Sequence, residues 1–297
     1  MAQILSLLRI KHWIKNLIVW TPLCFVGIEK WGTLIHLLNV FVSFCLSASI
    51  IYIINDLVDR KSDLLHPLKK FRPIACGRVK PYQALLVLLL LGALLISIWM
   101  FTGYFNPIVI LYIILNMFYS FWLKAVPIVD LMVVSLCYVL RLSAGFVTLS
   151  IDFPFWLLVA IYFFALSIIT GKRRSEIIQV EKKKAHRSVL GQYNLDFLNY
   201  IILISSIIAL NSYVIFVYVQ FNQNHSNLGM IFSMPLILFS VLKYLYNIFI
   251  MNQGGDPVEE IIRDKSLLVS VFSFVLITVI FTSMKIVNVL EVASWFR

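Results

Sequence analysis

The chain has 297 residues, of which 61% are hydrophobic and only 13% are charged. In a soluble domain about a quarter of the residues are charged, so this composition excludes an ordinary soluble protein and indicates an integral membrane protein. A formal net charge of +11 would suit a protein that binds nucleic acid, but the basic residues are distributed between apolar segments, which argues against that class. We find no internal repeats or low-complexity linkers, and we expect a single domain over residues 1–297.

The first sixteen residues mix apolar side chains with Arg9, Lys11 and Lys15, a pattern typical of a short helix at the membrane surface. Apolar segments that approach the length of a membrane crossing then recur along the chain. They cover about residues 17–28, 34–54, 82–101, 107–123, 126–149, 153–171, 197–219, 228–251 and 267–287. This pattern predicts an all-α polytopic membrane protein with nine transmembrane helices.

The distribution of basic residues predicts the orientation of these helices. If all nine segments cross the membrane, twenty of the twenty-five Lys and Arg residues fall on the side of the N-terminus. The positive-inside rule assigns that side to the cytoplasm. We therefore predict an inner (cytoplasmic) membrane protein whose N-terminus and long loops face the cytoplasm, where soluble phosphorylated metabolites and Mg²⁺ are available.

The strongest chemical signal follows the second apolar segment, in IYIINDLVDRKSDLLHPLKKFRPIACGRVK (51–80). Asn55, Asp59 and Asp63 are spaced four residues apart, and Asp56 precedes Asp63 by seven. A continuous helix would place these four side chains along one face. Such hard oxygen donors hold Mg²⁺, which typically bridges to substrate phosphates. We predict that the four residues bind Mg²⁺.

Basic residues surround this acidic stretch. Lys69, Lys70 and Arg72 follow it, and we predict that they bind phosphate groups beside the metal. A solvated charged loop is the alternative, but like charges on one helical face repel each other unless a cation binds between them. Further candidates for phosphate contact fall near one face of an N-terminal helix, at i, i+4 and i+5, and they are Lys11, Lys15 and Asn16. Anchoring at the membrane surface also explains these three residues.

The loop after the sixth apolar segment is strongly basic. It begins with Lys172, Arg173, Arg174 and Glu176, at the expected depth of a lipid phosphate. We predict that Lys172 and Arg173 act on the substrate. Attraction to anionic lipid headgroups better explains the later cations of this loop, which are Lys182, Lys183, Lys184 and Arg187.

Several polar residues within or beside the apolar segments admit two interpretations. Tyr119 and Lys124, at the end of the fourth segment, either bind substrate or anchor the chain at the membrane interface. Arg141 lies within the fifth segment, where a charge is costly and usually faces a cavity or a partner. It is eleven residues from Asp130, too far for a direct pair in one straight helix, so it is either a pocket residue or a tie between helices.

The last basic loop, NQGGDPVEEIIRDK (252–265), combines structural and functional signals. Gly254 permits a positive φ or a close backbone approach. Asp256 and Pro257 predict the start of a helix, with Glu259 and Glu260 in its first turn. Arg263 and Asp264 then remain free to reach a ligand.

The acidic stretch also carries a resemblance to a known family. NDLVDRKSD (55–63) resembles the NDxxDxxxD signature of UbiA-type intramembrane prenyltransferases, whose fold has nine transmembrane helices around a lipid-accessible cavity. The similarity extends to the decaprenyl-phosphate phosphoribosyltransferase branch of this family, in stretches at 9–16, 66–77, 119–130, 140–145, 171–176 and 254–264. Members with aromatic acceptors carry a second aspartate-rich motif after the sixth span, where this chain has Lys172, Arg173 and Glu176.

The resemblance implies a Mg²⁺-dependent transfer of 5-phosphoribosyl from 5-phosphoribose 1-diphosphate to a polyprenyl phosphate. Asp56, Asp59, Asp63, Lys172 and Arg173 would be the catalytic residues. The lipid phosphate or the rest of the pocket would contact Lys172, Arg173, Arg263, Tyr119, Lys124 and Arg141. Transfer of a prenyl chain from its diphosphate to an aromatic or other small acceptor is the alternative, followed by a membrane transporter. Prenyl chain length, the number of Mg²⁺ ions and the formation of a homo-oligomer are left open by the sequence.

Overall fold

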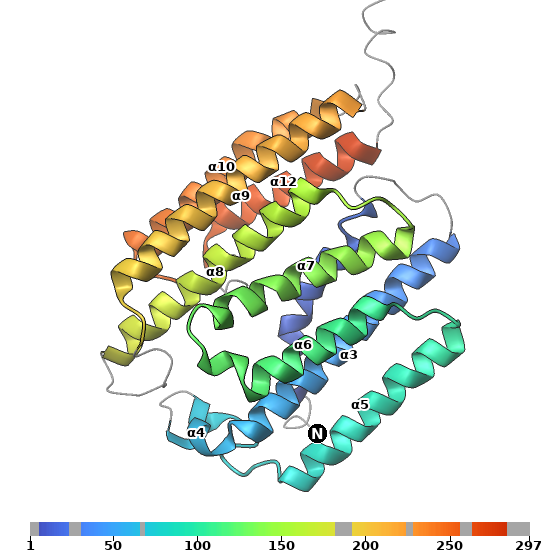
Figure 1. Cartoon of the computed structure of the whole chain (residues 1–297), viewed down its shortest axis with the longest axis vertical. Helices are drawn as coiled ribbons and strands as arrows, with labels where there is room; N and C mark the ends of the chain where they lie inside the picture. The colour runs from blue at the N-terminus through green and yellow to red at the C-terminus, as the bar shows by residue number, and fades with distance from the viewer. Residues whose placement is uncertain are drawn as a thin grey trace, which may run out of the picture.

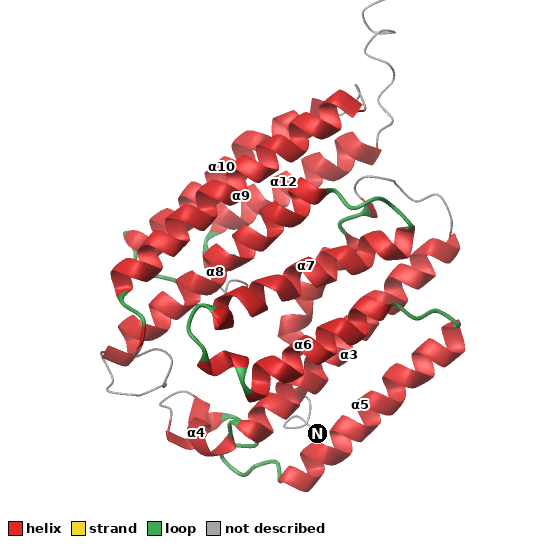
Figure 2. Cartoon of the chain, in the orientation of Figure 1, coloured by secondary structure: helices red, strands yellow, loops and turns green. Residues whose placement is uncertain are grey.

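The computed structural model of the chain describes residues 6–23, 31–65, 69–181, 192–223, 228–255 and 263–283. Within these ranges the secondary structure is helical and contains no strand, which confirms the predicted all-α class (Figure 2). The elements are η1 (Ile10–Trp20), α3 (Trp31–Val58), α4 (Arg60–Leu65), η2 (Lys69–Phe71), α5 (Pro81–Thr102), α6 (Pro107–Phe121), η3 (Leu123–Ala125), α7 (Val129–Leu149), α8 (Phe155–Glu181), α9 (Leu195–Gln223), α10 (Leu228–Phe249) and α12 (Lys265–Ser283).

Six of the described helices are long and apolar enough to cross a membrane, namely α3, α5, α7, α8, α9 and α10. The apolar helix α6 and the apolar part of α12 are shorter. The chain is therefore an integral membrane protein, as its composition predicts. The first predicted crossing, 17–28, begins in the 3₁₀-helix η1 and then leaves the described ranges, so the number of nine crossings remains a prediction.

The helices pack side by side in an order that brings α3, α6, α7 and α8 together (Figure 1). Helix α3 contacts η1, α5, α6 and α7, while α7 continues to α8 and α8 to α9. Buried apolar side chains from α3, α6 and α7 form one core cluster around Phe44 and Tyr112, whose ring centroids lie 5.1 Å apart. Helix α5 instead exposes apolar side chains, since Leu89 and Leu90 are 72% and 62% exposed. That surface suits contact with lipid hydrocarbon.

Two glycines permit close approach between segments. A Cβ at Gly145 of α7 would collide with the backbone carbonyl of Val19 in η1. Gly254 has a φ of 142°, and a Cβ there would lie 2.9 Å from the carbonyl oxygen of Gly171 in α8. The structure thus confirms the prediction of a positive φ or a close backbone approach at Gly254.

Polar side chains at helix starts also join neighbouring helices. The Asn106 side chain accepts a hydrogen bond from the backbone amide of Ile108 at 3.0 Å and caps α6. Asp264 begins α12 in the same way, and its carboxylate pairs with Lys243 of α10 at 3.2 Å. Hydrogen bonding, chiefly from Asn247, holds the pKa of Asp264 below its ordinary value. The prediction that Asp264 remains free for a ligand is wrong, because the cap and the ion pair occupy its carboxylate.

Candidate active site

A cavity of about 270 Å³ lies between α3, α6, α7 and α8. Each of these helices presents to it side chains that recur at intervals of three and four residues, the spacing of one helical face. Helices α7 and α8 contribute Val134, Cys137, Tyr138, Arg141, Ile169, Lys172, Arg173 and Glu176. Helices α3 and α6, with the residue after α3, contribute Ala48, Ile51, Tyr52, Asn55, Asp59, Tyr112, Asn116, Tyr119 and Ser120. The remaining lining residues are Lys15, Lys69 and Arg72.

The charged lining of this cavity is mostly basic. Its only carboxylates among the described residues are Asp59 and Glu176, whereas its cations are Lys15, Lys69, Arg72, Arg141, Lys172 and Arg173. A cleft lined by one sign of charge, between low-dielectric helices, attracts ligands of the opposite sign. The cavity is therefore suited to anions.

The predicted metal ligands begin at the end of α3, which continues almost unbroken into α4. The backbone amide of Asp59 bonds to the carbonyl of Asn55, and that of Asp63 to the carbonyl of Asp59, both at 2.8 Å. The side chains of Asn55 and Asp59 accept from Lys124 Nζ at 3.4 and 2.5 Å. Lys124 is thus linked to this pair, which lies at the cavity wall.

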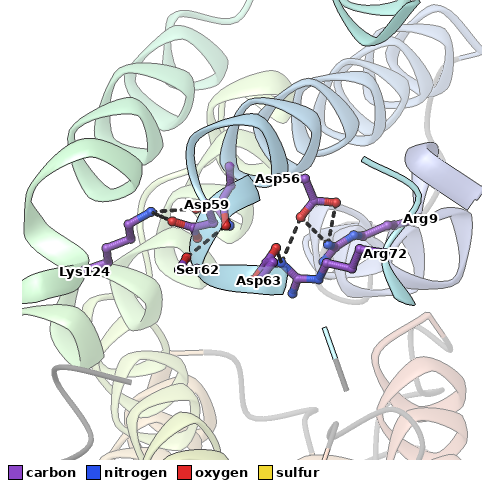
Figure 3. Close-up of polar contacts among 8 residues, drawn as sticks. Arg9, Asp56, Asp59, Ser62, Asp63, Arg72 and Lys124 are labelled. Carbon is purple, nitrogen blue, oxygen red and sulfur yellow. Dashed lines mark hydrogen bonds and ion pairs between the residues drawn. The ribbon is translucent and has the colours of Figure 1, made fainter. Parts of the chain in front are cut away.

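Asp56 and Asp63 form a second pair (Figure 3). Both are buried, and they share Arg72, whose Nη1 lies 3.0 Å from Asp56 and 2.7 Å from Asp63. Arg9 Nη2 lies 2.6 and 2.9 Å from the two carboxylate oxygens of Asp56, while its guanidinium stacks over the ring of Tyr52 at 4.7 Å. Burial raises the pKa of Asp63, and the charge of Arg72 opposes that shift.

The prediction that the four side chains share one face agrees with helical geometry, since steps of about 100° per residue place them within an arc of about 100°. The cations that approach this face divide the four residues into two pairs, Asn55 with Asp59 and Asp56 with Asp63. Lys124 then neutralises the first pair, and Arg72 with Arg9 neutralises the second. The acidic motif is divided between the cavity wall and a buried ion-pair network.

The donor set still fits a magnesium ion. Asn55, Asp56, Asp59 and Asp63 offer hard oxygen atoms, and Mg²⁺ commonly uses one or two carboxylates together with substrate phosphates. In the part of the chain that the structure describes, no three His, Cys, Asp or Glu side chains meet closely enough to hold a metal ion by themselves. The residues therefore fit a metal ion that is bound jointly with a phosphate-bearing ligand.

Arg173 is the most constrained cation of the α8 wall. Its Nε lies 3.0 Å from Asp130, its Nη1 lies 3.0 Å from Glu176, and its Nη2 donates to the Tyr119 hydroxyl at 3.2 Å. Tyr193 donates to the other oxygen of Asp130 at 2.5 Å, and burial raises the pKa of that hydroxyl. The structure brings the predicted residues Lys172, Arg173 and Tyr119 to the cavity that Asn55 of α3 and the following Asp59 also line.

Arg141 lies in the middle of α7 and lines the same cavity. It donates to Asn16 Oδ1 at 2.7 Å, to the Cys137 carbonyl at 2.9 Å and to the Tyr112 hydroxyl at 2.8 Å. Its guanidinium also lies 4.7 and 5.2 Å from the ring centroids of Tyr112 and Tyr138. The sequence left a pocket residue and a tie between helices as alternatives, and the structure shows both.

The N-terminal candidates do not share one face. Lys11 is exposed, Lys15 lines the cavity, and Asn16 is buried beneath Arg141. The prediction is wrong because η1 is a 3₁₀-helix, in which each residue turns the chain by about 120°. At that step the three side chains point in three different directions.

Two other candidates lie away from the cavity. Lys70 is exposed, with its Nζ 5.2 Å from the ring centroid of Phe71. Arg263 is also exposed and lies two residues before α12. Neither lines the cavity, so their predicted roles, Lys70 at the donor phosphates and Arg263 at the lipid phosphate or pocket, stay predictions. The later cations of the second long loop and the predicted helix start at 256–260 lie outside the described residues.

Sequence reasoning missed part of the site. Tyr112, Asn116 and Tyr138 line the cavity, and Arg9 binds Asp56. A signal for the α6 residues existed, since Tyr112, Asn116 and Tyr119 are spaced as one polar stripe in an otherwise apolar segment. Arg9 offered no local signal that distinguishes it from the other N-terminal cations.

Comparisons with known proteins agree with this architecture. The model of the UbiA prenyltransferase family matches residues 17–257. The decaprenyl-phosphate phosphoribosyltransferase of Mycobacterium tuberculosis is 29% identical, over 90% of this chain and 89% of its own length. The enzyme of that name from Corynebacterium glutamicum is 31% identical, over 90% and 83%. A solved UbiA homolog from Archaeoglobus fulgidus, bound to GPP and Mg²⁺, superposes with a TM-score of 0.70 at 20% identity, covering 95% of this chain and 97% of that one.

Proposed function

Because the chain belongs to the UbiA prenyltransferase family, we propose that it transfers a 5-phosphoribosyl group from 5-phosphoribose 1-diphosphate to a polyprenyl phosphate. The similarity to decaprenyl-phosphate phosphoribosyltransferases over 90% of the chain supports this choice within the family. The products are a polyprenylphosphoryl-5-phosphoribose and diphosphate.

The charge of the cavity is the observation that carries the proposal. One edge offers the amide of Asn55 and the carboxylate of Asp59, and the remaining charged lining is basic apart from Glu176. A sugar donor with a diphosphate and a monophosphate, together with a lipid phosphate, supplies the anions that these cations need. Transfer of a prenyl chain to a small acceptor would bring a single diphosphate to this mostly basic lining, so the phosphoribosyl reaction matches its charge better.

The donor diphosphate is assigned to the acidic edge. Asn55, Asp56, Asp59 and Asp63 would hold Mg²⁺, which neutralises charge on the departing diphosphate when it is bound. Arg72 lines the cavity while it binds Asp56 and Asp63, so it connects the buried pair to a phosphate in the cavity. Lys69 supplies a second cation there.

The reaction joins the lipid phosphate to C1 of the ribose. The C1–O bond to diphosphate breaks, a phosphate oxygen of the lipid forms a new bond to C1, and in-line displacement inverts that carbon. Lys172 and the constrained Arg173 orient the lipid phosphate. A phosphate monoester is already anionic at neutral pH, so the attack requires no general base.

The membrane location suits both substrates. The prenyl chain would lie among the apolar helices, and the charged cavity would open toward the cytoplasm, where the soluble donor is available. The excess of Lys and Arg in the loops on the side of the N-terminus supports this orientation.

A second candidate is transfer of a prenyl chain from its diphosphate to a small acceptor. The shared fold with a homolog whose structure contains GPP and Mg²⁺ favours it. Helices α3 and α6 to α8 would then hold the prenyl diphosphate at the acidic edge, and the basic wall of α8 would face the acceptor.

A paired membrane assay tests the two candidates. One reaction contains labelled 5-phosphoribose 1-diphosphate and a polyprenyl phosphate, and the other contains a polyprenyl diphosphate and labelled 4-hydroxybenzoate. Ribose label that enters the lipid phase is expected. If the ribose label stays in water while the aromatic acid becomes lipid-soluble, the second candidate replaces the first; if neither label moves, a transporter becomes the better explanation.

A further inference from the structure

Arg141 has a different environment from Arg173, although both line the cavity. Arg173 contacts two carboxylates, Asp130 and Glu176. Arg141 is only 7% exposed, and its hydrogen-bond partners in the described part of the chain are all neutral. It also lies eleven residues beyond Asp130, which corresponds to about 16 Å along the helix.

The guanidinium of Arg141 has hydrogen-bond donors left over. An arginine carries five N–H groups, one on Nε and two on each terminal nitrogen. Asn16 accepts the Nε hydrogen, the Cys137 carbonyl accepts one from Nη1, and the Tyr112 hydroxyl accepts one from Nη2. Within the described residues, one N–H on each terminal nitrogen has no acceptor. Terminal nitrogens of arginine commonly bind two oxygens of one phosphate.

The aromatic neighbours stabilise this cation without neutralising it. The rings of Tyr112 and Tyr138 lie close enough for cation–π attraction. A charge in a membrane-spanning segment without a counterion is nevertheless costly, and such residues usually serve a ligand or a partner. A tie between helices would not by itself require a charge, since neutral side chains also donate hydrogen bonds.

We propose that Arg141, together with Tyr112 and Tyr138, forms a second phosphate subsite in the cavity, which binds a phosphate monoester without a metal ion. The inference rests on the proposed function for the identity of that monoester. The donor carries one on C5 of the ribose, and the lipid acceptor carries another. The donor diphosphate is assigned to the acidic edge near Asp59 and the lipid phosphate to Lys172 and Arg173, so the C5 phosphate of the donor is the monoester that remains for Arg141, and shared binding of the lipid phosphate is the other outcome of the test.

Thermal stabilisation of the purified protein in detergent tests this subsite without any turnover. The probes are ribose 5-phosphate against ribose, and polyprenyl phosphate against polyprenol, all with EDTA present so that metal-dependent binding does not contribute. We expect one phosphorylated probe to raise the unfolding temperature more than its unphosphorylated partner. A shift with ribose 5-phosphate identifies the donor's C5 phosphate, and a shift with polyprenyl phosphate identifies the lipid.

Two variants link the shift to Arg141. Arg141→Gln should raise the half-saturating concentration by about ten-fold, because a charged hydrogen-bond donor is lost. Arg141→Lys should raise it by about three-fold, because the charge remains but the forked donor is lost. Lys243→Gln is the matched control, since Lys243 pairs with Asp264 and does not line the cavity, and its half-saturation should equal that of the wild type.

The proposal is overturned if neither phosphorylated probe stabilises the wild type over its partner. It is also overturned if Arg141→Gln binds the phosphorylated probe with the half-saturating concentration of the wild type. If Arg141→Gln does not fold, a wild-type half-saturating concentration in Arg141→Lys overturns the proposal instead. Monoester binding that depends on Arg141, in a protein that fails to transfer phosphoribose, would keep the subsite and refute only the proposed reaction.

Discussion

Nε of Arg173 lies 3.0 Å from Oδ2 of Asp130, so a cation of α8 is fixed by a buried carboxylate at the start of α7. Tyr193 holds the other oxygen of that carboxylate at 2.5 Å. Asp130 and Tyr193 do not line the cavity, whereas Arg173 does. The orientation of Arg173 toward a ligand is therefore set in part by a residue outside the cavity lining, which makes Asp130 a positioning residue.

Substituting Asp130→Asn should lower turnover by about ten-fold, because loss of a charge-assisted hydrogen bond leaves Arg173 less firmly positioned. The Michaelis constant for the lipid phosphate should rise more than that for the donor, since Arg173 is assigned to the lipid. Steady-state kinetics with each substrate varied in turn would measure both effects. Asp196→Asn is the matched control, because Asp196 is exposed on α9. Equal kinetics for the two variants would show that Asp130 does not position Arg173.

Asp59→Asn should remove most of the turnover while the protein remains folded. Asp59 is the carboxylate of the acidic motif that lines the cavity, so it is the closest candidate for shared contact with a metal ion and the donor diphosphate. Activity in membranes and the unfolding temperature in detergent should be measured together. Near-normal activity in a folded Asp59→Asn protein would refute the metal role.

Lys172→Ala should impair use of the lipid acceptor more than use of the donor. The residue lines the cavity from α8, beside Arg173. Losing one charged contact to a phosphate should raise the Michaelis constant for the lipid by about ten-fold. A defect confined to the donor would reverse the assignment of the two substrates to the two walls.

Removal of divalent metal should abolish transfer. Asn55 and the three carboxylates near it offer oxygen donors, but the described residues do not form a site that holds a metal ion without a ligand. Metal affinity should therefore depend on the donor diphosphate, so that EDTA stops the reaction and Mg²⁺ restores it. Turnover that continues unchanged in EDTA would contradict the proposed mechanism as a whole.

Gly145→Ala should destabilise the fold by about 1–3 kcal/mol, the usual range for overpacking a tight site. Its methyl group would collide with the backbone carbonyl of Val19, which cannot move without displacing η1. Gly92→Ala in α5 is the control, because a Cβ there meets nothing within 4 Å. That control should be neutral or stabilising, since alanine favours a helix over glycine by about 1 kcal/mol. Equal unfolding temperatures for the two variants would refute the close approach.

The features predicted correctly from the sequence depend on local patterns. Apolar segments of sufficient length predicted the membrane helices, and the spacing of charged residues predicted that Asn55, Asp59, Lys172 and Arg173 are candidates for a site. These residues do line one cavity, because the faces of α3 and α8 that carry them, with the residue after α3, both border it. Their roles in the reaction remain proposals.

The features that the sequence did not predict depend on partners far along the chain. Arg9 binds Asp56 across 47 residues, and Arg141 binds Asn16 across 125. No spacing rule gives such pairs. The division of the acidic motif into two pairs has the same origin, because the cations that approach from two sides decide which carboxylates act together.

The 3₁₀ geometry of η1 has a consequence for how this segment can change in length. Lys11 faces outward, Lys15 faces the cavity and Asn16 supports Arg141, so three neighbouring surfaces depend on one short helix. One residue inserted between Lys11 and Lys15 would rotate everything before it or after it by about 120°. The insertion would move Lys11 or Lys15 to a different surface of the helix, or place another residue where the Asn16 amide now holds Arg141. Substitutions at the outward position should therefore be tolerated across related proteins, whereas insertions and deletions within the helix should be rare.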